Sequence, residues 1–175
     1  MAGENEAVLR YLYVEQLPSW RTAQSVWIKD GYPLSTHPDL GERLQEINDA
    51  AGGPATLRYL YGKPALLADN GTIVAFAQGT HVFCVRLRAR ACDPELVVQR
   101  REPQSRFPLL AEKQRELAAL TEREWTRLDP FPVNVPRADG LARLADHVAR
   151  AVAHATGGWS DDGEAHTGFE PVPPP

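Results

Sequence analysis

Three apolar-rich runs follow one another closely in the middle of the 175-residue chain: residues 65–68, 72–78 and 81–90. The Asn70-Gly71 pair between the first two favours a tight hairpin turn, because both residues tolerate positive φ. Gly79 can form the second turn for the same reason. The sequence therefore predicts an antiparallel meander at the centre of the fold.

Helical periodicity flanks this meander on both sides. Apolar residues recur at helical spacing in two pieces within residues 4–30, in residues 38–51 after a cap at Thr36 or His37, and in residues 108–123. Residues 125–128 fit an edge strand, because prolines follow them closely. A last helix begins near Asp139 and ends at Gly157-Gly158. The face that this helix is expected to bury carries Leu141, Leu144, Ala145, Val148, Val152 and Ala155.

The third apolar run places a histidine and a cysteine near three arginines. Side chains alternate between the two faces of a strand, so His81 and Cys84 point in opposite directions. They cannot readily share a zinc ion or act as a base and a nucleophile. Cys84 and Cys92 share a face but lie roughly 26 Å apart at about 3.3 Å per residue, whereas a disulfide needs Cα atoms within about 7 Å. We expect no disulfide and no bound metal.

Arg86, Arg88 and Arg90 project from the same face of that predicted strand. Two interpretations stay open. The face is either solvated, with the arginine stems packed on neighbours, or an anion-binding surface, because guanidinium groups match carboxylate and phosphate. Cys84 lies beside Arg86 and is the candidate for a reactive thiol, although a cysteine more often behaves as a small buried hydrophobe.

Two other groups of residues attract attention. A basic stripe at helical spacing lies beside the expected buried face of the last helix and is predicted to be solvated. Its residues are Arg143, His147, Arg150 and His154. Its two histidines lie about 10 Å apart, too far for one metal ion. Trp20 and Trp27 share one helical face near the N-terminus and form either core packing or a partner surface.

Charge and composition exclude several classes of protein. The net charge of −4 comes entirely from the segment after Thr156, so the rest of the chain sums to zero. No global basic excess exists to drive nucleic-acid binding. No run of eighteen apolar residues predicts a transmembrane helix. With two cysteines and no signal-peptide layout, the sequence predicts a cytoplasmic protein.

The run "RYLYGKPALLADNGTIVAFAQGTHVFCVRL" resembles the TfoX N-terminal domain. The shared pattern is Arg-x-x-aromatic-Gly followed by strand, Asx-Gly turn, strand, turn and strand. The residues on this pattern are Arg58, Tyr61, Gly62, Asn70, Gly71 and Phe83. The late "EWTRLD" and the helix after it are similar to the Trp-bearing strand and closing helix of YjbR-type domains, which extends the resemblance over residues 37–155.

The resemblance implies an α+β fold in which a twisted antiparallel sheet has its helices packed on one side. Residues 1–36 would be an N-terminal helical extension, and residues 156–175 have the composition of a disordered acidic, proline-rich tail. No catalytic residue follows from the family, and no cofactor is implied. The link of some bacterial members to regulation of competence genes suggests a regulatory or accessory role.

We therefore expect a non-catalytic cytoplasmic domain that acts by binding, with a protein as the partner. One alternative is binding of nucleic acid or an anionic ligand through Arg86, Arg88 and Arg90. A second alternative is an enzyme that uses Cys84. No reaction is identified by the sequence.

Overall fold

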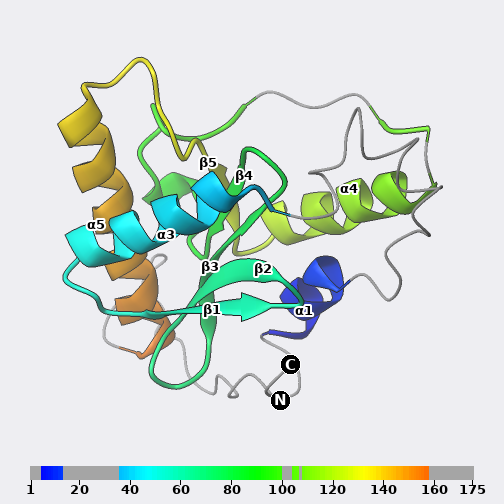
Figure 1. The fold of residues 1–175 in the computed structure, drawn as a ribbon, viewed down its shortest axis with the longest axis horizontal. Coiled ribbons are helices and arrows are strands. Elements are labelled where there is room, and N and C mark those ends of the chain that lie inside the picture. The colour runs from blue at the N-terminus through cyan, green and yellow to red at the C-terminus, as the bar shows by residue number, and fades with distance from the viewer. Residues whose placement is uncertain (1–4, 14–35, 100–103, 107, 158–175) are drawn as a thin grey trace.

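The computed structural model describes residues 5–13, 36–99, 104–106 and 108–157. A five-stranded antiparallel sheet runs in the order β1-β2-β3-β4-β5, so each strand lies beside its neighbour in sequence (Figure 1). The strands are β1 (Thr56–Leu60), β2 (Lys63–Leu67), β3 (Ile73–Gln78), β4 (Val82–Val85) and β5 (Thr126–Leu128). The helices are α1 (Glu6–Leu12), α3 (Pro38–Ala50), α4 (Pro108–Thr121) and α5 (Arg137–Ala155), with a short 3-10 helix at Ala89–Ala91. The predicted α+β class and the meander are confirmed.

Helices cover both faces of this sheet, whereas the resemblance implied one. On one face, α3 and α5 contribute Leu44, Ile47 and Val148 to a core that includes Phe83 and Val85. On the other face, α1 and the segment from α4 to Trp125 form a second core, whose members include Val8, Leu12, Ile73, Phe76, Cys84, Leu120 and Trp125. The burial of the inner strands agrees with this two-sided cover, because β2 and β3 are buried at every residue. Continuous apolar runs, rather than alternating ones, are typical of strands that are covered on both sides.

Polar contacts hold α1 against the second face. The Asn5 side chain donates to the Gly71 carbonyl at 3.0 Å and accepts from the Ile73 N–H at 2.9 Å, so it bridges the two ends of a turn. At the other end of α1, Lys63 donates to the Leu12 carbonyl at 2.5 Å, and Lys113 donates to the Arg10 carbonyl at 2.8 Å. Cations are favourable at a helix C-terminus. The short helix is thus part of the folded body rather than an arm projecting from it.

β4 is shorter than the predicted run of residues 81–90, and it ends at Val85. The Arg86 N–H still reaches the Val74 carbonyl at 2.8 Å, but Leu87 N–H turns back to the Val85 carbonyl at 2.9 Å. The chain leaves the sheet there although β3 continues to Ile73, because Leu87 makes this local bond and its carbonyl accepts from the Thr126 hydroxyl at 2.7 Å. The alternation of faces up to Leu87 is confirmed: Phe83, Val85 and Leu87 lie in the first core, whereas Cys84 lies in the second.

A proline within β2 leaves one backbone carbonyl of β3 without a hydrogen-bond donor from the neighbouring strand. The register pairs Ala65 with Phe76 and, extended by one residue, places Pro64 opposite Ala77. Proline has no N–H to give to the ladder. The Thr36 hydroxyl donates to the Ala77 carbonyl at 3.2 Å instead. This contact fixes the start of α3, where His37 is the N-cap, as predicted, and accepts from the Asp39 N–H.

Candidate functional site

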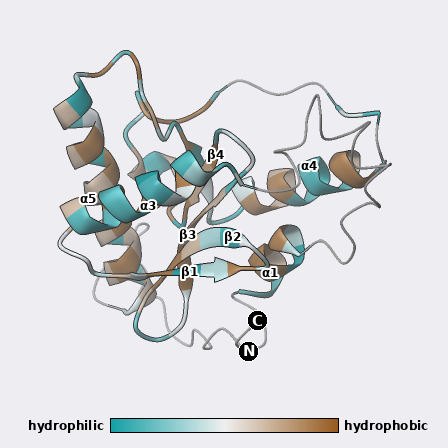
Figure 2. Ribbon diagram, viewed as in Figure 1, coloured by the Kyte–Doolittle hydropathy of each residue, from teal (hydrophilic) through white to brown (hydrophobic). Residues whose placement is uncertain are grey.

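The outer edge of β1 is open as far as the described residues show. β1 is the first strand in the sheet order, and no strand among the described residues pairs with its outer side. Figure 1 shows it as the outermost strand, with α1 near its C-terminal end. Its burial also differs from that of β2, β3 and β4, because most of its residues are exposed. Figure 2 shows its arrow pale, whereas the central strand β3 is brown.

The register of the β1–β2 hairpin fixes which backbone groups face outward. Tyr61-Gly62 forms a two-residue turn in which both residues have positive φ, 52° and 81°, as in a type I′ turn. The turn makes Leu60 and Lys63 the first hydrogen-bonded pair. Alternation then directs the backbone N–H and C=O groups of Leu57 and Tyr59 away from β2. They present donors and acceptors to a sixth strand.

Tyr59 lies against a helix and yet stays exposed. Its residue is 56% accessible, and its hydroxyl oxygen would be 2.5 Å from a Cβ at Gly41 of α3. Glycine inside a helix costs about 1 kcal/mol relative to alanine, so its presence in α3 has a steric reason here. The absent side chain at Gly41 makes room for the Tyr59 ring, whose hydroxyl end lies close to α3 there.

Tyr61 is exposed and held in an uncommon backbone conformation. It is the only described non-glycine residue with positive φ, where asparagine, aspartate and glycine are preferred. Its ring packs edge-to-face on Tyr13, with centroids 4.9 Å apart. The two tyrosines are 43% and 45% accessible. Tyr59 and the Tyr13–Tyr61 pair therefore flank the open edge from its two faces.

A buried amine lies beneath this aromatic pair. Lys63 follows the turn directly and is only 3% exposed. Burial, together with the nearby charge of Lys113, lowers the pKa of Lys63 to about 8. Since its ammonium donates to the Leu12 carbonyl, it ties the end of α1, and with it Tyr13, to the hairpin.

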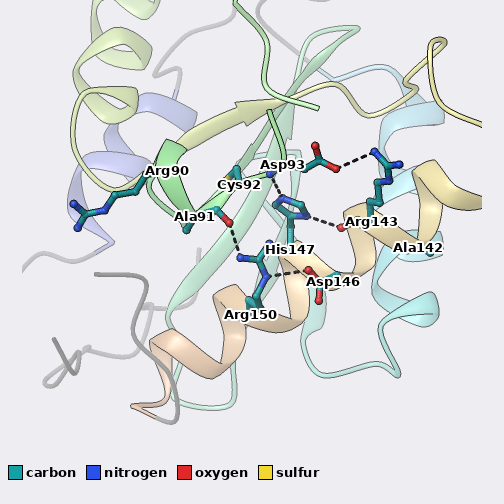
Figure 3. Close-up of a pocket in the computed structure, with 9 residues that line it drawn as sticks. All are labelled: Arg90, Ala91, Cys92, Asp93, Ala142, Arg143, Asp146, His147 and Arg150. Atoms are coloured by element: carbon teal, nitrogen blue, oxygen red, sulfur yellow. Dashed lines mark hydrogen bonds and ion pairs between the residues drawn. The ribbon is translucent and has the colours of Figure 1, made fainter. Parts of the chain in front are cut away.

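A hollow of about 430 Å³ lies between α5 and the chain that follows β4, away from β1 (Figure 3). His147 is at its centre and is buried. The imidazole Nε2 accepts from the Asp93 N–H at 2.9 Å, so the ring proton resides on Nδ1, which contacts the Arg143 carbonyl at 2.6 Å. Burial lowers the pKa of His147. The ring is a neutral structural link between α5 and the preceding turn.

Charged side chains at the rim of this hollow are paired with one another. Arg143 contacts Asp93 at 3.0 Å, and Arg150 contacts Asp146 at 2.9 Å and the Ala91 carbonyl. Arg90 extends away from the other labelled side chains in Figure 3. Both imidazole nitrogens of His147 are engaged in hydrogen bonds, so the ring is not available as a base. The predicted solvated stripe on α5 is therefore wrong at its two histidines, since His147 and His154 are both buried.

Neither cysteine has the surroundings of a nucleophile. Cys84 is fully buried, and burial raises its pKa to about 12, so the thiol stays protonated near neutral pH. Cys92 donates weakly to the Arg88 carbonyl at 3.5 Å. Both are free thiols. The hypothesis of an enzyme using Cys84 has no chemical support in this geometry.

The three arginines predicted to project together are separated in the structure. Arg86 is 1% exposed, contacts Glu124 at 3.1 Å and lies 5.7 Å from the Trp125 ring centroid. Arg88 and Arg90 are exposed, but they lie beyond the end of β4, at and within the 3-10 helix. A shared anion-binding face is therefore not formed. Trp20 and Trp27 lie outside the described residues.

The residues around β1 were missed as a site by sequence reasoning, although one signal was present. "RYLYGKP" carries two tyrosines just before a glycine and has Tyr-Gly where a tight turn would favour Asn-Gly. A bulky residue in such a turn is a local inconsistency, which in natural proteins is typical of functional positions.

No family model, no curated protein and no solved structure matches this chain. The resemblance to TfoX N-terminal and YjbR-type domains stays a prediction. Among the helices that the structure describes, none is long and apolar enough to cross a membrane.

Proposed function

We propose that this domain is a non-catalytic binding module that takes an extended segment of a protein partner as a sixth strand at the outer edge of β1. The observation that carries the proposal is an open strand edge flanked by exposed tyrosines that the fold holds in place. Strand addition supplies affinity through main-chain hydrogen bonds, and side-chain pockets supply specificity.

The tyrosines suit this role for a physical reason. Rigid aromatic side chains lose little conformational entropy on binding and dominate the energetics of many interfaces. Tyr59 approaches α3 at Gly41, and Tyr61 is restrained by its turn and by Tyr13. The Tyr13–Tyr61 pair therefore loses less side-chain conformational entropy when a partner binds.

The alternatives have less support. Binding of nucleic acid rested on three arginines on one face, and the burial of Arg86 removes that arrangement. Catalysis by Cys84 is opposed by its burial and raised pKa. The free thiols of Cys84 and Cys92 support a reducing compartment such as the bacterial cytoplasm.

A random peptide display library selected on the full chain tests the proposal. Selected peptides should perturb the amide NMR signals of Leu57 and Tyr59 more than those of the inner strands. Tyr61→Asn and Tyr59→Thr should each weaken binding at least tenfold without lowering the melting temperature by more than a few degrees. Val133→Ser removes an exposed apolar side chain away from β1 and should leave affinity unchanged. Selected peptides whose binding leaves β1 unperturbed would refute the proposal.

A further inference from the structure

The open edge of β1 has a hollow beside its N-terminal half. The hollow measures about 350 Å³ and is lined by Thr56 and Arg58 of β1, Leu67 of β2 and the turn at residues 68–71. Arg58 shares its strand face with Leu60, which is buried in the core beneath α1. A strand added to β1 would therefore direct every second side chain toward this hollow.

Arg58 brings to the hollow a positive charge that forms no ion pair with any described group. It is exposed and has no hydrogen-bond or ion-pair partner in the described part of the chain. By contrast, acidic side chains pair with Arg10, Arg43, Arg86, Arg143 and Arg150. A guanidinium presents a fork of donors that a carboxylate accepts in two parallel hydrogen bonds.

A second copy of this chain is a poor occupant of the edge. An antiparallel partner strand that uses the outward groups of both Leu57 and Tyr59 would pair each of them with the other. In a self-pairing of β1 this register places Arg58 directly opposite Arg58 of the second copy, and like charges directly opposite destabilise a strand pair. The same charge that disfavours self-association selects for an acidic partner.

Asp69 limits how much negative charge the hollow accepts. It lies at the turn that lines the hollow, is exposed, and has no partner within the described ranges. One carboxylate can pair with Arg58, whereas a densely acidic segment would meet repulsion from Asp69.

Building on the proposed function, we propose that the segment bound at β1 carries an acidic side chain that pairs with Arg58 in this hollow. On the same side of the segment, two or four residues away, lies an apolar or aromatic side chain that packs on the Tyr13–Tyr61 pair. Residues two apart along a strand are separated by about 6.6 Å, and on β1 Arg58 lies two residues before Leu60, which directly precedes Tyr61.

Parallel selections of a randomised peptide display library on the wild-type chain and on Arg58→Glu test this inference. Wild-type selection should enrich peptides with one Asp or Glu at this spacing from an apolar residue, and Arg58→Glu selection should enrich Lys or Arg at the same position. Wild-type peptides should bind Arg58→Ala at least tenfold more weakly and Asp69→Asn more tightly. Arg137→Ala, which removes an exposed arginine from α5, should not change affinity.

The outcomes separate the two proposals. If selected peptides perturb Leu57 and Tyr59 but show no acidic preference and bind Arg58→Ala as well as the wild type, the charge pairing is wrong and the strand-addition site stands. If neither selection yields a peptide that perturbs β1, both are wrong.

Discussion

The hydroxyl oxygen of Tyr59 occupies the space that a Cβ atom at Gly41 would need. Alanine in place of a helical glycine ordinarily gains about 1 kcal/mol. Here Gly41→Ala should gain less, because the Tyr59 ring must shift to admit the new methyl group. Combined with Tyr59→Phe, which removes the blocking oxygen, the substitution should recover most of the gain. Urea unfolding of the two single variants and the double variant measures this coupling, and strict additivity would contradict the packing described for Tyr59.

The acid sensitivity of the domain should depend on His147. Because its pKa is lowered in the fold, the unfolded chain binds more protons below the ordinary histidine pKa of about 6.5. Stability should therefore fall as the pH drops below about 6.5, by at most about 1.4 kcal/mol per pH unit from this group, and stop falling below the folded-state pKa. Protonation also turns the acceptor of the Asp93 N–H into a donor. Three charged neighbours also affect the pKa of this ring: Arg150, Asp146 and Asp93. They are unchanged when His147 alone is replaced, so they do not account for a difference between that variant and the wild type.

Unfolding in urea between pH 5 and pH 8 measures that slope. His147→Gln keeps an acceptor and a donor but does not titrate, so its stability should vary less with pH than that of the wild type. Equal slopes for both proteins would mean that the acid sensitivity resides elsewhere.

Arg86 and Arg88 should differ sharply when replaced by alanine. Arg86 is buried between Glu124 and Trp125, so Arg86→Ala removes packing and leaves the Glu124 carboxylate, which is partly exposed, without its cation. We expect a loss of roughly 3 kcal/mol, at the low end for a broken buried pair. Arg88→Ala at an exposed position should cost less than about 1 kcal/mol. Thermal or urea denaturation of both variants provides the comparison, and similar losses would contradict the placement of Arg86.

Lys63 should titrate at an unusually low pH for an amine. The chain has three lysines, so ¹³C-labelled lysine side chains give a simple NMR spectrum. One Cε signal should move with a midpoint near pH 8, and Lys63→Arg should remove it. A Lys63 midpoint above pH 10 would show that the amine is solvated and that α1 is not held through the Leu12 carbonyl.

The meander was predictable because its signals are local. Asn70-Gly71, the apolar runs and the alternation of faces through Phe83 and Cys84 depend on residues close in sequence. The helix starts near His37 and Asp139 were also close to the observed bounds. The end of β4 was not predictable, because it depends on the contact of Leu87 with the distant Thr126, and a run of alternating arginines looks strand-like whether or not the backbone continues the ladder.

The candidate site depends on distant residues and could not be found in this way. Tyr59 meets Gly41 across the space between β1 and α3, and Tyr61 meets Tyr13 at the end of α1. Likewise, His147 looked solvent-facing because helical spacing alone does not show that the chain at Asp93 covers it. Only the tertiary packing reveals which exposed aromatic side chains are held rigidly.

The hydrogen bond from Lys113 to the Arg10 carbonyl joins residues 103 positions apart, and it seals the core beneath α1. During synthesis from the N-terminus, the hairpins of β1 to β4 emerge well before α4 and Trp125 are available to cover them. A nascent chain that stops short of Trp125 would present Ile73, Phe76 and Cys84 to water on an uncovered sheet face. Exposed apolar surface on incomplete chains promotes aggregation. For this protein, the interval between translation of β4 and of Trp125 is therefore when chaperone contact matters most.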